Sequence, residues 1–214
     1  MKKIVIATTN KNKVKRIKDL FKDEKYEFLS LEDLNIGDLG DPEETASSPV
    51  GIAMEKAKYY VDRLPEGYII LTQDDTLSFE GVNEEDNPGL HIKKPVVDKY
   101  GSFSDNNAAD YYTSLAKKYG GSIPVVFNYG HAVAIKTNGE REMVKIIGSS
   151  SKLEMKLVDK VNKLETVPGY FLSACTEVES NGKWMPYNDL TEEEKIAVDI
   201  DVYKSISGLL ENMQ

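Results

Sequence analysis

The sequence predicts a mixed α/β fold, with one mixed β-sheet and flanking helices, in one large or two-lobed domain over residues 1–214. Three observations support this. The chain opens with an apolar run followed by a helical pattern, strand-like and helical segments then alternate, and an Asn-Gly hairpin signal lies in the second half. With 214 residues, 40% of them apolar and 29% charged, the chain can bury a substantial core.

The first elements are a strand, a tight turn and a helix. Residues 4–7 (IVIA) form a short β-branched run of the kind that is buried in a sheet. Residues 8–10 (TTN) are good helix caps. The apolar residues that follow recur on one helical face: Val14, Ile17, Leu20 and Phe21.

The remaining pattern predicts three helices and three strands, separated by turn-rich loops. We expect helices over 50–64, 108–119 and 191–212, and strands over 68–72, 125–136 and 142–147. The strand over 68–72 is expected to end at Gln73-Asp74-Asp75, and Asn138-Gly139 predicts the hairpin turn. Residues 151–164 stay open, although Leu153, Leu157, Val161 and Leu164 have helical spacing.

Composition narrows the range of partners. The chain has 27 basic and 36 acidic residues, a formal net charge of -9, which disfavours nucleic-acid polymers but leaves room for a small phosphate ligand. The single cysteine, Cys175, cannot form an internal disulfide and suits a reducing compartment. The apolar run near the start is too short for a signal peptide, and no stretch is long enough to span a bilayer. We therefore expect a cytoplasmic protein without membrane contact.

The first candidate site is the turn before the opening helix. Thr8, Thr9, Asn10 and Lys13 bring hydroxyl, amide and ammonium donors to a helix N-terminus, where phosphates bind well. A simple helix cap with solvated lysines explains the same residues, and no Gly-rich phosphate loop is present.

Two acidic segments form the second candidate site. Asp74 and Asp75 follow an apolar strand, and carboxylates there can hold Mg²⁺ or orient a water as general base. A carboxylate from the loop Asp41-Pro42-Glu43-Glu44 can complete such a metal site. An Asx turn and a solvated loop are the structural alternatives.

Other reactive residues carry no recognisable motif. His91 and His131 have no partner at helical spacing, so zinc is disfavoured. Cys175 is expected to serve packing, and the sequence contains neither GxSxG nor CxxC.

Taken together, these segments resemble the inosine triphosphate pyrophosphatase family, which hydrolyses non-canonical purine nucleoside triphosphates. Residues 8–13 (TTNKNK) match its T-x-N-x-x-K phosphate motif, the most specific part of the resemblance. The other similar segments follow in the family's order: 44–48 (ETASS), Ala53 with Lys56-Ala57, 73–77 (QDDTL), 87–93 (NPGLHIK) and 191–195 (TEEEK).

The resemblance implies an elongated mixed sheet between two lobes, a nucleotide cleft between them, and a homodimer. It implies Mg²⁺-dependent hydrolysis of a nucleoside triphosphate to the monophosphate and pyrophosphate. The implied roles are as follows: phosphate binding by Thr8, Thr9, Asn10 and Lys13; metal binding by Glu43 or Glu44 with Asp74 or Asp75; water activation by Asp74 or Asp75; and base contacts by Tyr170 and Lys195.

The sequence departs from the family pattern mainly at the base end. Arg16 replaces an acidic residue and Gly51-Ile52 replaces Glu-Asn, while residues 168–172 (PGYFL) lack the Asp-Pro and Asp199-Ile200-Asp201 stands for Ser-His-Arg. In the family the last two segments grip the base, so the resemblance implies no particular base here. The alternatives are a non-catalytic nucleotide-binding or regulatory protein on the same scaffold, and a hydrolase of sugar phosphates or other small phosphates.

Overall fold

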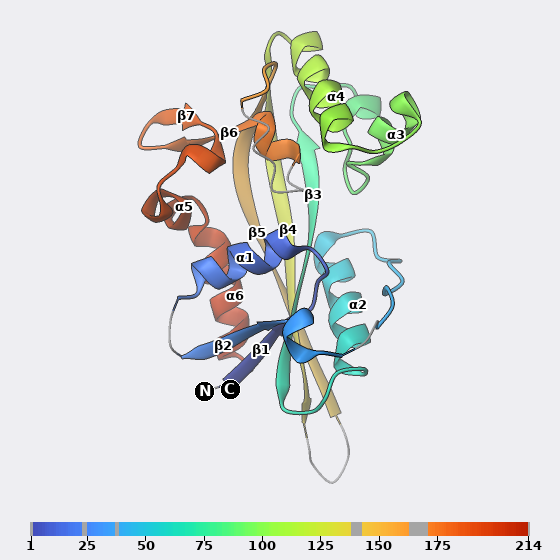
Figure 1. Ribbon diagram of the computed structural model, residues 1–214, viewed down its shortest axis with the longest axis vertical. Helices are drawn as coiled ribbons and strands as arrows, with labels where there is room; N and C mark the ends of the chain where they lie inside the picture. The colour runs from blue at the N-terminus through green and yellow to red at the C-terminus, as the bar shows by residue number, and fades with distance from the viewer. Residues whose placement is uncertain (1, 23–24, 37–38, 138–142, 163–170, 214) are drawn as a thin grey trace. The chain divides into compact units, whose positions relative to one another are not determined.

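A seven-stranded mixed sheet, in the order β2-β1-β3-β4-β5-β6-β7, runs through the described part of the chain (Figure 1). The computed structural model describes residues 2–22, 25–36, 39–137, 143–162 and 171–213. Its strands are β1 (Lys2–Ile6), β2 (Tyr26–Ser30), β3 (Tyr68–Phe79), β4 (Ser122–Thr137), β5 (Met143–Val158), β6 (Thr176–Ser180) and β7 (Lys183–Met185). Its α-helices are α1 (Lys11–Leu20), α2 (Pro49–Val61), α3 (Lys94–Tyr100), α4 (Asp105–Lys118), α5 (Glu192–Val198) and α6 (Ile200–Glu211).

The strand directions make the sheet mixed. β1 pairs in parallel with β2 and with β3, whereas β5 pairs antiparallel with β6 and β6 with β7. The predicted mixed α/β fold is therefore confirmed. The predicted hairpin turn at Asn138-Gly139 lies outside the described residues.

Two compact units share this sheet. Unit 1 comprises Met1–Asp75, Tyr129–Ser151 and Asp201–Gln214, and unit 2 comprises Thr76–Asn128 and Lys152–Ile200. Strands β3, β4 and β5 each contribute residues to both units. All the phosphate and metal candidates predicted from the sequence belong to unit 1.

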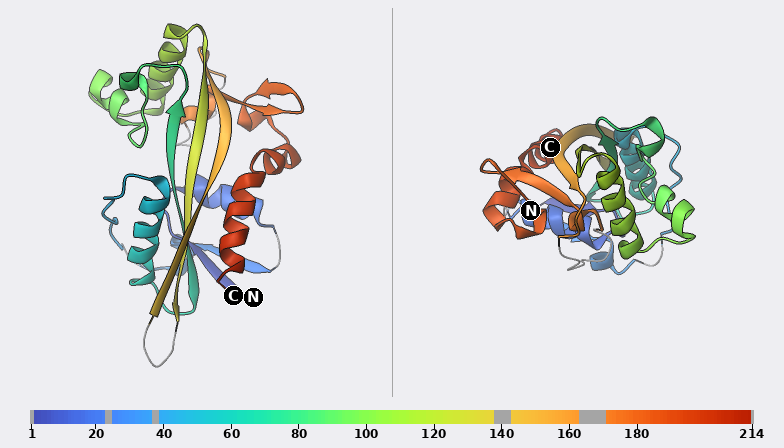
Figure 2. Two further views of the ribbon diagram at one scale, coloured as in Figure 1. Left: turned by 180° about the vertical axis from the view of Figure 1, so that it is seen from behind. Right: turned by 90° about the horizontal axis from the view of Figure 1, so that it is seen from above.

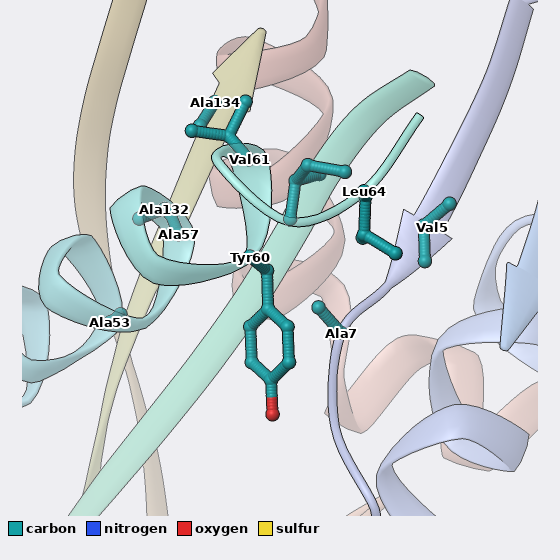
Figure 3. Packing of buried hydrophobic residues seen from close by; sticks show 10 residues of the cluster. Val5, Ala7, Ala53, Ala57, Tyr60, Val61, Leu64, Ala132 and Ala134 are labelled. Carbon is teal, nitrogen blue, oxygen red and sulfur yellow. The ribbon is translucent and has the colours of Figure 1, made fainter. Parts of the chain in front are cut away.

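In unit 1, α2 packs on one face of the sheet through a cluster of mostly small residues (Figure 3). The cluster joins Ala53, Ala57, Tyr60, Val61 and Leu64 to Val5, Ala7, Ile70, Ala132 and Ala134. Gly130 of β4 shows how close the helix lies, because a Cβ there would stand 2.1 Å from the carbonyl carbon of Pro49. Only glycine fits beneath the first turn of α2, which fixes the height of this helix above the strands.

Helices α1 and α6 lie on the other side of β3, β4 and β5 in unit 1, as Figures 1 and 2 show. Ile17 of α1 and Ile206 of α6 are buried. Phe21, which ends α1, stacks on Tyr203 of α6 with ring centroids 4.8 Å apart. The two helices thus share one apolar layer, opposite the layer beneath α2.

Unit 2 has its own aromatic core. Tyr112 of α4 is fully buried, stacks on Phe171 at 6.0 Å and meets the edge of Phe79 at 5.9 Å. Its hydroxyl donates to the carbonyl of Ile92 at 2.6 Å, so the buried phenol keeps a partner. Burial raises the pKa of this phenol well above its ordinary value.

Two expectations about secondary structure need correction or completion. The helix predicted over 191–212 is two helices, α5 and α6, which break at Asp199, where the buried carboxylate accepts a 2.6 Å hydrogen bond from Tyr187. Residues 151–158, left open above, belong to strand β5, because side chains from Ser151 to Met155 alternate between buried and exposed. A four-residue spacing of leucines is even-numbered, so it fits the period of a strand as well as a helix.

Among the described residues, no helix is both long and apolar enough to cross a membrane.

Candidate active site

The opening strand, turn and helix form as predicted, and the turn is held by its own side chains. β1 ends beside β3, where the amide of Ala7 donates to the carbonyl of Leu71 at 2.8 Å. Asn10 is the N-cap of α1: its side-chain oxygen accepts from the amides of Asn12 at 3.0 Å and Lys13 at 3.3 Å. The Thr8 hydroxyl accepts from the Asn10 amide at 3.2 Å. These bonds hold the first turn of α1, and with it Lys13, at the carboxyl end of β1.

The strand that carries the two aspartates is longer than predicted. β3 continues through Asp74 and Asp75 to Phe79, so the expected strand end at these residues is wrong. Its pairing with β1 stops at Leu71, because β1 turns away at Ala7. Asp74 and Asp75 therefore lie in the middle of a strand, just past the end of its neighbour.

Successive strand residues point to opposite faces of a sheet, and this separates the two aspartates. Asp75 forms an ion pair with Lys13 of α1, with 2.7 Å between Nζ and Oδ2. Asp74 points to the α2 face, where Lys56 Nζ lies 3.4 Å from its Oδ1. The same ammonium lies 2.7 Å from Oε1 of Glu44. Two lysines thus hold three carboxylates at the end of β1.

Partial burial strengthens both ion pairs. The side chains of Lys13 and Asp75 are 20% and 18% exposed, and those of Lys56 and Asp74 are 18% and 16% exposed. The side chain of Glu44 is more open to solvent, with 48% of it exposed. Charges so placed are screened less than those of an exposed salt bridge.

Burial and charge have opposing effects on the pair of Lys56 and Asp74. Burial alone would lower the pKa of Lys56, but its contacts with Glu44 and Asp74 outweigh it and raise the pKa. Burial raises the pKa of Asp74, and Asp75 adds to this effect, although Lys56 and Lys13 oppose it. Attraction therefore outweighs burial for Lys56 but not for Asp74, because Lys56 also has a second and nearer carboxylate, that of Glu44. The ionised form of Asp74 is consequently less favourable than that of a solvent-exposed carboxyl.

The acidic loop is fixed to α2 by Glu55. This carboxylate accepts from the Thr45 amide at 2.9 Å, the Thr45 hydroxyl at 2.5 Å and the Ala46 amide at 3.2 Å. Gly51 leaves room for the loop, since a Cβ there would come within 2.6 Å of Ala46 Cβ. The loop is thereby held so that Glu44 meets Lys56.

The site has a donor set that fits a hard divalent cation bound together with phosphates. No group of three or more His, Cys, Asp or Glu side chains arranged to hold a metal occurs in the described ranges. Mg²⁺, however, is usually bound by one or two carboxylates together with substrate phosphates, not by a complete protein cage. Glu44 and Asp74 already share one cation, the Lys56 ammonium, so their oxygens can face a common positive charge.

The remaining predicted residues fall in different places. Thr9 and Glu43 are exposed, in the turn and in the acidic loop. Lys195 lies in α5 of unit 2, where its ammonium is 3.1 Å from Glu192. Tyr170 lies outside the described residues.

Two residues near the site were missed as candidates from the sequence. Lys56 was noted only as part of a helical motif, yet it joins Glu44 to Asp74. A lysine on the face of a helix that packs against an acidic strand was the available signal. His131 was set aside because it has no metal-binding partner at helical spacing, yet the charges of Lys13, Arg16 and Asp75 shift the pKa of its ring. Its sequence context gave no signal.

The fold and the site define a mixed α/β protein with a capped turn before its first helix and lysine-paired carboxylates at the end of its first strand. The Ham1 family matches residues 4–122, which is more than half of the chain. The chain therefore belongs to the Ham1 family, and the resemblance found from the sequence motifs is confirmed at the level of the family.

One curated relative and several solved structures extend this finding. The chain is 38% identical over 107 residues to the dITP/XTP pyrophosphatase of Caldanaerobacter subterraneus subsp. tengcongensis. That match covers 50% of each protein, so the chain spans about half the length of this relative. The HAM1 protein of Coxiella burnetii has a TM-score of 0.66 at 18% identity, covering 99% of this chain and 100% of that one. The Ham1 protein of Staphylococcus aureus has a TM-score of 0.62 at 20% identity, covering 100% of both chains. These structural likenesses establish the fold.

Proposed function

We propose that this chain is a Mg²⁺-dependent nucleoside triphosphate pyrophosphatase that hydrolyses an NTP or dNTP to the monophosphate and pyrophosphate. The observation that carries the proposal is the pairing, near the carboxyl end of β1, of Lys13 with Asp75 on the α1 face and of Lys56 with Asp74 and Glu44 on the α2 face. The curated relative that shares 38% identity with half of this chain is a dITP/XTP pyrophosphatase, which supports the same activity.

Both lysines are expected to exchange partners when substrate binds. A triphosphate offers Lys13 and Lys56 a denser negative charge than the carboxylates do. Lys13 then leaves Asp75, and Lys56 leaves Asp74 and Glu44. Each exchange frees a carboxylate beside the bound phosphates, so phosphate binding and carboxylate release are coupled.

The freed carboxylates are expected to divide the work by face. Glu44 and Asp74, which share Lys56, are the proposed ligands of the cation. When bound there, Mg²⁺ supplies a Lewis acid that neutralises charge on the phosphates. Asp75, on the α1 face, is the proposed acceptor of the proton from the attacking water. Base assistance of this kind is typically worth about 10²- to 10⁴-fold in rate.

Phosphate binding also involves the turn before α1 in this proposal. Thr8, Thr9, Asn10 and Lys13 line or hold the turn, and α1 has no acidic residue in its first turn to repel an anion. The amides of Asn12 and Lys13 already donate to Asn10, so Lys13 is expected to contribute most of the charge.

The test is a substrate panel with the purified chain. Canonical and deaminated NTPs and dNTPs are incubated with Mg²⁺ or Mn²⁺, and pyrophosphate and orthophosphate are measured separately. We expect pyrophosphate release with at least one nucleotide, and none after chelation of the metal. Orthophosphate release alone would favour the small-phosphate hydrolase. Thermal stabilisation by a nucleotide without turnover would favour the non-catalytic nucleotide-binding protein.

Three further features belong to this proposal. Base contacts by Tyr170 and Lys195 are tested by comparing bases in the same panel. A homodimer is expected to show twice the mass of one chain in light scattering. A cytoplasmic location agrees with Cys175 as a free thiol, whose pKa burial raises to about 12.

A further inference from the structure

His131 of β4 is fully buried, yet one of its ring nitrogens has no partner. Its Nε2 lies 2.9 Å from the hydroxyl oxygen of Ser151 on β5. Its Nδ1 makes no hydrogen bond to any of the residues that the structure describes. A buried polar atom without a partner costs about 1–3 kcal/mol. Such an atom in a folded protein usually indicates a water or ligand that completes it.

The free nitrogen lies on the same face of the sheet as Asp75. Ala132 and Ala134 pack beneath α2, so the alternation of strand side chains places His131 on the α1 face. Asp75 reaches that same face, where it meets Lys13. The two nitrogens of an imidazole point in widely different directions, so with Nε2 at β5, Nδ1 faces away from β5. In the strand order, β3 and Asp75 lie on that side of β4.

The surroundings decide which nitrogen carries the proton. The His131 ring stacks on Tyr129 at 6.1 Å, and the Arg16 guanidinium lies 4.7 Å above the Tyr129 ring. Burial and the positive charges of Arg16 and Lys13 together lower the pKa of His131 to about 3, although Asp75 opposes them. The ring is therefore neutral near pH 7. Net positive surroundings favour a lone pair on Nδ1, which leaves the proton on Nε2 to donate to Ser151.

We propose that His131 is a positioning residue for the hydrolytic water: one O–H of this water donates a hydrogen bond to Nδ1, and the other O–H points to Asp75. This inference rests on the proposed function. A water with both protons engaged presents its lone pairs to the phosphorus. In the step, the water oxygen bonds to phosphorus, the phosphoanhydride P–O bond breaks, and pyrophosphate leaves with the electron pair. The proton passes to the Asp75 carboxylate, and His131 stays neutral throughout.

Two substitutions separate this role from structural support. In His131→Asn the amide branches where the ring does and retains an acceptor near the position of Nδ1, but it loses the reach to Ser151. In His131→Gln the longer side chain retains the contact with Ser151 and loses the acceptor at Nδ1. Ser151→Ala is the matched control, since it removes the Ser151 contact and leaves the imidazole unchanged.

We expect a large loss of kcat in His131→Gln alone. His131→Gln should lower kcat by about 10²-fold with little change in KM, since a misplaced reactant costs about that much. His131→Asn and Ser151→Ala should stay within about ten-fold of the unsubstituted protein. The opposite ranking, with His131→Gln active and Ser151→Ala slow, would show that the ring only supports the strands. Equal kcat for all three variants would also overturn the proposal. If His131→Asn does not fold, the other two variants still decide.

A spectroscopic measurement gives an independent answer. Long-range ¹H–¹⁵N correlation spectra of the ring should show the proton on Nε2 and a hydrogen-bonded acceptor at Nδ1. A proton on Nδ1 would overturn the proposal whatever the activity. Absence of turnover by the unsubstituted protein would refute the proposed function and, with it, any role for His131 in hydrolysis. Turnover that is insensitive to the ring would refute the role of His131 alone.

Discussion

Asp74 and Asp75 are neighbours in sequence, but the two faces of the sheet give them different environments. On the α1 face, Asp75 is matched one to one with Lys13. On the α2 face, Lys56 lies between Asp74 and Glu44, and burial raises the pKa of Asp74. One face therefore holds a balanced ion pair, and the other holds two carboxylates around a single cation. The proposed function assigns them separate tasks on this basis, with proton transfer on the α1 face and metal binding on the α2 face.

The largest expected effect comes from removing the carboxylate on the α1 face. Asp75→Asn should lower kcat for pyrophosphate release by about 10²- to 10⁴-fold, because the water loses its base. KM should change little, because Lys13 and Lys56 remain to bind phosphate. Steady-state kinetics at saturating metal measure both values. Full activity in Asp75→Asn would reverse the division of roles between the two faces.

Removal of Glu44 should weaken metal binding on the α2 face. Glu44→Gln is expected to raise the Mg²⁺ concentration for half-maximal activity by at least about 10-fold, with activity returning as metal is added. Calorimetric titration with Mg²⁺ in the presence of a non-hydrolysable nucleotide gives the affinity directly. The exposed neighbour provides the control: Glu43→Gln should match the unsubstituted protein. Equal effects from both variants would remove Glu44 from the metal site.

Asp74→Asn should weaken metal binding and yet stabilise the fold at neutral pH. Burial raises the folded-state pKa of Asp74 above 3.8, so folding favours its protonated form. That contribution is fully present below pH 3.8 and is lost as the pH rises through the folded-state pKa. The ionised carboxylate is therefore unfavourable near pH 7, and we expect its removal to raise the free energy of unfolding by about 0.5–2 kcal/mol.

Urea unfolding at pH 8 and pH 5 checks this sign. The advantage of Asp74→Asn should be smaller at the lower pH, because that pH is closer to the raised folded-state pKa of Asp74. Asp75→Asn is the matched comparison, because it leaves Lys13 without its carboxylate and should give no stabilisation. A destabilised Asp74→Asn protein would mean that the contact with Lys56 outweighs burial.

The smallest expected effect concerns the turn before α1. Asn10→Ala removes the cap that accepts from the amides of Asn12 and Lys13, and should lower the free energy of unfolding by about 1 kcal/mol. Fraying of this turn should also raise KM, because it carries Lys13. Chemical denaturation and kinetics measure the two effects. Thr9→Ala, at an exposed position of the same turn, should change neither.

Local patterns in the sequence predicted the elements that depend on local forces. A helix cap within residues 8–10 and the apolar face of α1 were both predicted, because capping and helical periodicity act within a few residues; the structure assigns the cap to Asn10. The final helix was predicted as one continuous helix. Its break lies at Asp199, whose hydrogen-bond partner Tyr187 belongs to a separate 3₁₀ turn that the helical pattern of 191–212 does not include. The course of β3 past Asp75 was missed for a related reason: polar residues normally end a buried strand, but here α1 and α2 supply their partners.

The sequence by itself determined the family, the mixed α/β class and the candidate residues Asn10, Lys13, Glu44, Asp74 and Asp75. Only the tertiary structure decided which of these residues lie together on each face of the sheet. The two-residue period of β3 sends adjacent carboxylates to opposite faces, and the helix that packs on each face decides which lysine each one meets. The position of His131 near Asp75 likewise depends on β4 lying beside β3. Contacts between residues so far apart in the chain arise from packing, which no local pattern encodes.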